Sequence, residues 1–202
     1  MKPLSKLFAD VTKSVGSSGI QFALTIISTP LMTRLYDPSA YATFGIIMSA
    51  VAAVVGIGML SLPSAYPAEK ESVARRELLK TMLLLLGLLV ALGALASIIV
   101  AAADDLHSGI HISGTALAFF PVLIFTSGIR QILTNIAIGR AHFNSTSLSQ
   151  IVEPICSRGS SIGLGFLAGG HPAFILFSTA LGQVIASVAI CHMLLKENMW
   201  LW

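Results

Sequence analysis

The sequence predicts an all-α integral membrane protein with about six transmembrane helices. Of its 202 residues, 55% are hydrophobic and only 10% are charged, whereas a soluble domain needs about 25% charged residues to keep its surface wetted. The mean hydropathy is +0.86. The sequence contains six continuous apolar runs, each longer than about 18 residues, which is the length of a membrane-spanning helix rather than of an alternating barrel strand.

The elements follow one another with clear breaks. Residues 1–14 carry apolar side chains at helical spacing (Leu4, Leu7, Phe8, Val11), which predicts an amphipathic helix along the inner face of the membrane. The transmembrane domain is residues 15–195, and residues 196–202 form a short cytoplasmic tail in which Trp200 and Trp202 are expected to anchor at the interface. The predicted transmembrane helices cover residues 15–35, 40–62, 79–102, 115–139, 147–168 and 173–195.

Proline, glycine and charged residues mark the loops. Pro63 and Pro67 end the second run, and a cluster of charges between Glu69 and Lys80 follows it. The segment Gly169-Gly170-His171-Pro172 separates the last two runs. The loop after the third run holds several metal-ligand types, but Ser108-Gly109 interrupts them, so we interpret it as solvated loop. Those residues are Asp104, Asp105, His107 and His111.

Lysine and arginine collect on one side of the predicted bundle. Three lie in the N-terminal segment, four in the second loop, and one each in the fourth loop and the C-terminal tail, whereas the odd-numbered loops contain only Arg34. Cytoplasmic loops are enriched in these residues. We therefore predict a multi-pass protein of the bacterial inner (plasma) membrane with both termini in the cytoplasm. The net charge of +3 reflects this asymmetry and does not indicate a nucleic-acid partner.

The fourth run contains an arginine at membrane depth. Arg130 lies about 15 Å from the cytoplasmic end of its helix, near the middle of the bilayer. Polar residues recur around it at steps of three and four and form one stripe: Ser127, Gln131, Thr134 and Asn135. Ionisable groups at this depth are costly and indicate function by default.

The fifth run repeats this pattern. Its polar residues follow one helical face, and Arg158 lies about 18 Å from the cytoplasmic end. The face consists of Gln150, Glu153, Ser157 and Ser160. Pro154 removes a backbone hydrogen bond beside Glu153, so a kink is expected there.

Other polar or small residues admit structural explanations. Gln21 and Gln183 are lone amides in the first and sixth runs, and either interhelical hydrogen bonds or cavity lining explains them. The glycine pairs Gly159/Gly163 and Gly165/Gly169 predict close helix packing. The two cysteines, Cys156 and Cys191, are interpreted as small apolar fillers.

Several segments resemble bacterial polysaccharide (O-antigen and capsule) flippases of the multidrug/oligosaccharidyl-lipid/polysaccharide exporter superfamily. The end of the first run is similar to an arginine-leucine-tyrosine-x-proline-x-x-aromatic stretch of that family; it reads Arg34-Leu35-Tyr36-Asp37-Pro38-Ser39-Ala40-Tyr41. The segments 139–143 and 163–170 also resemble the family. Ala42 and Ser61-Leu62-Pro63 depart from its usual glycine and charged pair.

The resemblance implies translocation of lipid-linked oligosaccharide across the membrane. Family members have about twelve or more helices in two lobes, and this chain resembles the amino-terminal half, so a second lobe or a homodimer is expected. The implied ligand is a polyprenyl-pyrophosphate-linked oligosaccharide, bound in a water-filled cavity. The expected binding residues are Arg130, Arg158, Glu153, Gln131, Asn135 and Gln150. Arginine suits this ligand because its planar fork binds phosphate oxygens in pairs.

Two alternatives come from other classes. A membrane-embedded transferase would need clustered acidic residues to hold a divalent cation. The cytoplasmic loops offer only Glu69, Glu71 and Glu77 among basic residues, so we expect no enzyme activity, metal or cofactor. The main alternative is a non-transporting scaffold or degenerate fragment, in which Glu153 and one arginine form a structural ion pair between the fourth and fifth helices.

Overall fold

The computed structural model describes residues 4–69, 71–104, 114–140 and 142–196. All regular secondary structure within these residues is helical, which confirms the all-α prediction. The helices are α1 (Leu4–Leu35), α2 (Pro38–Gly58), α3 (Leu62–Ala65), α4 (Ser72–Asp104), α5 (Gly114–Gly139), α6 (Phe143–Ala168) and α7 (Pro172–Lys196).

Five of the six predicted spans are helices that are long and apolar enough to cross a membrane: α1 from Val15, α2, α4 to Ala102, α5 and α7. The remaining span, predicted at 147–168, lies in α6. This helix has 26 residues and is about 39 Å long, which is sufficient for a bilayer, but its polar residues lower its mean hydropathy. The chain therefore has the architecture of a multi-pass helical membrane protein.

Three predicted boundaries differ from those in the structure. Residues 4–14 are helical, but they continue without a break into the first span. The second helix ends at Gly58 rather than at residue 62, because the ring of Pro63 would clash with the carbonyl of Met59 in a continuing helix. Leu60 and Ser61 make the turn with left-handed φ values of 50° and 56°.

The third predicted helix begins seven residues earlier, at Ser72 rather than at residue 79. Residues placed in the charged loop therefore form the first turns of α4. The segment from Ala74 to Lys80 consists of good helix formers, and Lys80 Nζ lies 2.7 Å from Glu77 Oε1 one turn earlier. Local propensity thus extends the helix beyond the apolar run.

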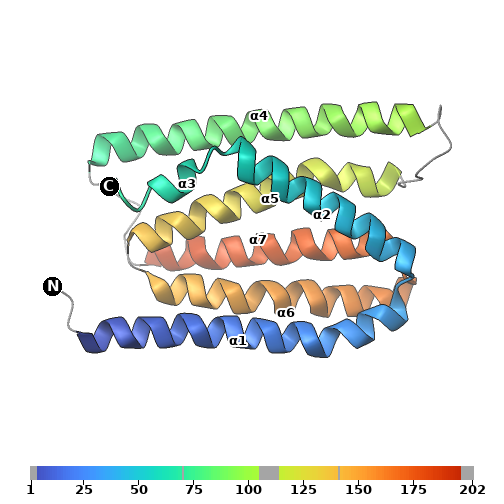
Figure 1. Ribbon diagram of the computed structural model, residues 1–202, viewed down its shortest axis with the longest axis horizontal. Helices are drawn as coiled ribbons and strands as arrows, with labels where there is room; N and C mark the ends of the chain where they lie inside the picture. The colour runs from blue at the N-terminus through green and yellow to red at the C-terminus, as the bar shows by residue number, and fades with distance from the viewer. Residues whose placement is uncertain (1–3, 70, 105–113, 141, 197–202) are drawn as a thin grey trace.

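The long helices form a bundle in which sequence neighbours are often not spatial neighbours (Figure 1). The order across the bundle is α1, α6, α7, α5 and α4, and each helix contacts the next. α2 runs obliquely across this layer and contacts α4, α5 and α7. α6 is therefore enclosed between α1 and α7, which accounts for a polar helix inside an apolar bundle.

The two ends of the bundle differ in charge. The start of α1, helix α3, the α5–α6 connection and the end of α7 lie at one end, and the α1–α2 and α6–α7 connections lie at the other (Figure 1). The first end includes Arg75, Arg76, Lys80 and Lys196, whereas the second includes Arg34. The asymmetry predicted from the loops is thus present in the folded chain.

The apolar core lies between α2, α4, α5 and α7. Its fully buried members include Val51, Met59, Met82, Leu86, Leu123, Ile124, Leu176 and Ile190. In a bilayer these contacts stabilise the fold through close packing, because lipid is as apolar as the side chains themselves. The core occupies one side of α5 and leaves the polar stripe of this helix on another.

A tyrosine fixes the α1–α2 connection to α6. Tyr36 is 2% exposed, and its hydroxyl donates to the carbonyl oxygen of Ser161 at 2.7 Å. Burial raises the pKa of Tyr36 above its ordinary value. A Cβ atom at Gly165 would lie 3.0 Å from the Tyr36 ring, which is tighter than ordinary van der Waals contact, so a larger residue there would press on the ring. The predicted close packing is confirmed at Gly165 and is wrong within the described residues at Gly159, Gly163 and Gly169, where a Cβ would meet open space.

Candidate functional site

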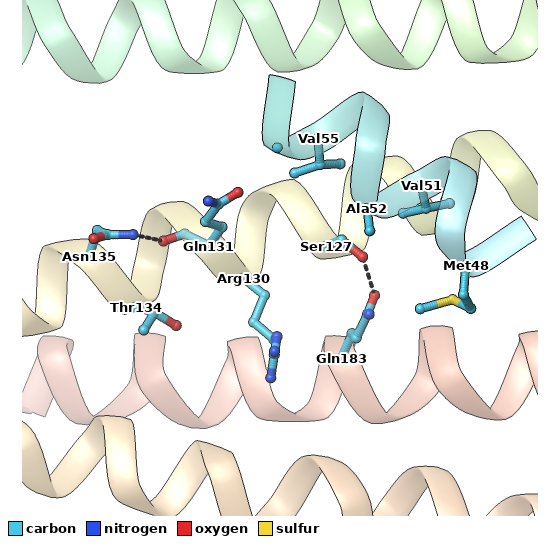
Figure 2. Close-up of a pocket in the computed structure, with 11 residues that line it drawn as sticks. Met48, Val51, Ala52, Val55, Ser127, Arg130, Gln131, Thr134, Asn135 and Gln183 are labelled. Carbon is cyan, nitrogen blue, oxygen red and sulfur yellow. Dashed lines mark hydrogen bonds between the residues drawn. The ribbon is translucent and has the colours of Figure 1, made fainter. Parts of the chain in front are cut away.

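The polar stripe of α5 lines a pocket of about 370 Å³, which we name the Arg130 pocket (Figure 2). All five residues of the predicted stripe contribute to it: Ser127, Arg130, Gln131, Thr134 and Asn135. α7 adds Gln183, and α2 closes the pocket with apolar side chains, among them Met48, Val51 and Val55. The pocket therefore combines one cation with several amides and hydroxyls beside an apolar wall.

Hydrogen bonds between helices hold part of this lining in place. Gln183 Oε1 accepts from Thr126 Oγ1 at 2.6 Å and from Ser127 Oγ at 3.1 Å, which joins α7 to α5. Figure 2 shows the bond from Ser127. Gln183 was predicted either to make an interhelical bond or to line a cavity, and it does both. Asn135 Nδ2 donates to the carbonyl oxygen of Gln131 at 2.9 Å.

Arg130 forms an ion pair with Glu153 of α6. Its side chain leaves α5 on the side of α7 and α6, whereas Gln131 points to the opposite side of α5 (Figure 2). Arg130 lies nine residues before the end of α5, and Glu153 lies ten residues after the start of α6. Both are therefore about 14–15 Å from the same end of the bundle, where they can meet.

The packing of α7 against α6 positions Glu153. A Cβ atom at Gly182 would lie 2.8 Å from the Ser157 Cβ and 2.9 Å from the Glu153 carbonyl oxygen. Only a glycine permits this approach without displacing a backbone. Because of it, Arg130 reaches past α7 to the Glu153 carboxylate, whose side chain is only 17% exposed, against 33% for Arg130.

A second pocket, of about 140 Å³, lies on the other side of this ion pair, and we name it the Arg158 pocket. Glu153, Ser157, Arg158 and Ser161 line it from α6. The polar groups from other helices are Gln21 and Thr25 of α1 and Thr179 of α7. Thr25 was not predicted to line a site, although it follows Gln21 by one helical turn and so shares its face.

The two arginines differ in their partners. Arg158 forms no hydrogen bond or ion pair with any residue that the structure describes. It lies about 7.5 Å farther along α6 than Glu153, and therefore at a different depth in the bundle from the Arg130–Glu153 pair. Glu153 is the only acidic residue in the six predicted spans, so the membrane interior keeps one cation in excess.

Gln150 is placed apart from the other predicted binding residues. It lies on the side of α6 that faces α1, where its Oε1 accepts from Ser17 Oγ at 2.8 Å. It lines neither the Arg130 pocket nor the Arg158 pocket. Helical periodicity places Gln150 on the same face as Glu153, but α1 covers the part of that face nearer the start of α6.

Metal ligation finds no support in the described part of the chain, which contains no group of three or more histidine, cysteine or acidic residues able to hold a metal ion. The predicted solvated loop with Asp105, His107 and His111, the side chain of Asp104, and the interfacial Trp200 and Trp202 lie outside the described residues.

The chemistry of this site is that of anion and hydroxyl recognition at membrane depth. Guanidinium groups bind phosphate or carboxylate oxygens, and the surrounding amides and hydroxyls bind sugar hydroxyls. Comparisons with protein-family models, with curated proteins and with solved structures found no match. Inferences about function therefore depend on the residues of this chain and their arrangement.

Proposed function

We propose that this chain takes part in moving lipid-linked oligosaccharide from the inner to the outer leaflet of a bacterial inner membrane. In this proposal both termini lie in the cytoplasm, and the ligand is an oligosaccharide on a polyprenyl pyrophosphate carrier. The bundle provides membrane spans, and the two pockets provide polar groups between them. The resemblance of residues 34–41 to polysaccharide flippases also supports this proposal.

The observation that carries the proposal is the excess of cation over anion at membrane depth. Arg130 and Arg158 are accompanied by one carboxylate, Glu153, which is bonded to Arg130, and both arginines line pockets that contain hydroxyls and amides. If these residues had only a structural role, their charges would be expected to sum to zero, because an unpaired charge is costly at membrane depth. A pyrophosphate ligand would supply the missing negative charge.

The Arg130–Glu153 pair has a defined place in this scheme. While no ligand is present, the Glu153 carboxylate compensates the charge of Arg130. A pyrophosphate would compete with this carboxylate for the guanidinium group. Translocation would then follow from two lobes that rock about the site, as transporter repeats do. The second lobe would come from another copy of the chain or from another protein.

A non-transporting membrane scaffold is the second candidate, and the ion pair itself favours it. Arg130 and Glu153 join α5 to α6, as a structural pair would. This candidate accounts for Arg130, but it gives no role to Arg158.

Deletion of the gene in its source organism tests the proposal. The measurement is the amount of lipid-linked oligosaccharide in each leaflet, together with polysaccharide at the cell surface. We expect accumulation in the cytoplasmic leaflet and loss of surface polysaccharide, restored by the wild-type gene and by the matched variant Arg76→Gln, which removes an exposed charge outside the pockets. Unchanged pools in the deletion strain would support the scaffold instead.

A further inference from the structure

An apolar groove, which we name the α2–α4 groove, runs between α2 and α4 on the side of α2 opposite the Arg130 pocket. It consists of two cavities of about 500 Å³ and 220 Å³, and Ala96 of α4 and Phe120 of α5 line both of them. Among the described side chains around it, only that of Ser97 carries a polar atom, and its hydroxyl donates to the carbonyl oxygen of Gly93 at 2.9 Å. The α2–α4 groove therefore offers an occupant hydrocarbon contacts and no hydrogen bond.

The groove has the depth of one membrane leaflet. It extends along α4 from Leu89 to Val100 and along α2 from Gly58 back to Ile46, which is about 17 Å on each helix. Val100 lies about 6 Å before the end of α4, at the end of the bundle that holds the α1–α2 connection (Figure 1). From there the groove reaches the middle of a hydrocarbon core about 30 Å thick. In the proposed orientation this half of the core is the outer leaflet.

The size of the groove favours a single lipid chain over a helix of another protein. A helix about 10 Å wide would occupy about 1,300 Å³ over this length, which is nearly twice the combined volume of the two cavities. The walls also meet at the inner end, where a Cβ atom at Gly58 would lie 2.5 Å from Leu89 Cδ2. A hydrocarbon chain is only about 4–5 Å wide at normal carbon–carbon contact distances, so it enters with room for branches.

Small residues recur on both walls at the interval of the methyl branches of an isoprenoid. Ala50 and Ala53 line the groove from α2, three residues apart, which is a rise of about 4.5 Å. Gly93 and Ala96 line it from α4 with the same spacing. An extended chain advances about 1.1–1.2 Å per bond, so methyl groups on every fourth carbon recur at about 4.6 Å. A straight chain would leave these recesses unfilled and would lose dispersion contacts.

We infer that the α2–α4 groove binds an isoprenoid chain of about four isoprene units, with its headgroup at the end of the bundle that holds the α1–α2 connection. The inference rests on the proposed function in the choice of an isoprenoid carrier as the source of this chain. In the proposed orientation the groove holds the carrier in the outer leaflet, after translocation. The carrier tail then has a site of its own, separated from the Arg130 pocket by α2.

Photolabelling of the purified full chain in phosphatidylcholine nanodiscs tests this site. The probe is geranylgeraniol with a diazirine on its chain, which is about 18 Å long and has neither phosphate nor sugar. We expect labelled peptides from residues 46–58 and 89–100, identified by mass spectrometry. Unlabelled geranylgeraniol should compete at least about tenfold better than hexadecanol, which has the same main-chain length without branches.

Two variants fill the groove, and a third serves as the matched control. Ala96→Leu and Ala53→Leu should each lower the labelling at least about fivefold, because the larger side chain takes the space of the probe. Both alanines are exposed, so the change does not crowd the core. Ala91→Leu makes the same change at an exposed position of α4 that lines neither cavity, and its labelling should stay within about twofold of wild type.

Three results would overturn the inference. The first is equal competition by hexadecanol, which would mean that ordinary acyl chains fill the groove. The second is labelling that neither Ala96→Leu nor Ala53→Leu reduces. The third is an absence of labelling together with disulfide cross-linking between copies that carry Ala96→Cys, which would assign the groove to a second copy of the chain.

The same variants separate the groove from the proposed function. Labelling that Ala96→Leu and Ala53→Leu abolish, together with unchanged leaflet pools in the deletion strain, would keep the groove and contradict translocation. Altered pools in the deletion strain that both variants restore fully, together with no labelling of the groove, would keep translocation and contradict the groove.

Discussion

At the scale of single residues, one carboxylate controls the charge balance of the membrane interior. Glu153 is bonded to Arg130 and also lines the Arg158 pocket. Where surroundings are poorly solvated, the loss of one member of an ion pair leaves an uncompensated charge, whereas the loss of both members can cost little. This asymmetry distinguishes a true pair from two groups that merely lie near each other.

The pair can be tested by a double-mutant cycle. We expect Glu153→Gln and Arg130→Gln each to lower the free energy of unfolding by about 1–3 kcal/mol, and the double variant to lose less than the sum of the two. The measurement is unfolding in mixed micelles with increasing SDS. Strictly additive losses would show that the two residues do not interact.

The contact at Gly182 gives a second prediction. Gly182→Ala should lower the free energy of unfolding by about 1–3 kcal/mol, because the new methyl group would press on Ser157 and on the carbonyl of Glu153. The matched control is Gly159→Ala, where a Cβ meets open space and the change should be neutral or stabilising by about 0.5–1 kcal/mol. Equal effects in the same unfolding assay would contradict the proposed contact between α6 and α7.

At the scale of the elements, Tyr36 in the α1–α2 connection and Tyr41 in the first turn of α2 have different roles. Tyr36 is bonded to α6, whereas the hydroxyl of Tyr41 has no partner. Tyr36→Phe should therefore destabilise the chain by about 1 kcal/mol, and Tyr41→Phe should leave its stability unchanged or raise it. Thermal unfolding of the two variants in detergent checks this difference. A larger loss for Tyr41→Phe would show that its hydroxyl is bonded within the fold.

Helix α6 shows how an element is determined by its neighbours. By hydropathy it is the weakest of the six predicted spans, and it does not qualify among the apolar helices. Its polar groups are directed to α1 through Gln150, to α5 through Glu153 and into the Arg158 pocket. A helix with such groups is acceptable in a membrane because other helices surround them.

At the scale of the whole molecule, the charge asymmetry predicts orientation. In a chain with Cys156 and Cys191 replaced by alanine, a cysteine introduced by Ser72→Cys should be protected from a membrane-impermeant maleimide in intact cells. One introduced by Ser39→Cys should react, since both positions are exposed and lie at opposite ends of the bundle. The reverse labelling pattern would show that the basic end faces outward.

The sequence by itself determined the fold class, the spans and the α5 stripe. Those features depend on local composition and period: apolar runs long enough for a bilayer, and Ser127, Gln131 and Asn135 at one-turn steps beside Arg130. The same local signals misplaced the end of α2 and the start of α4, because Pro63 and the helix-forming charged segment act outside the apolar pattern.

The tertiary structure alone decided which polar groups meet. The sequence predicted that Glu153 would pair with one arginine or serve in binding, but only the packing of α5, α6 and α7 selected Arg130. It also placed Gln150 against Ser17. The physical reason is that hydropathy fixes how deep a residue lies in the membrane, whereas its partners depend on the order and rotation of neighbouring helices, which side-chain packing sets.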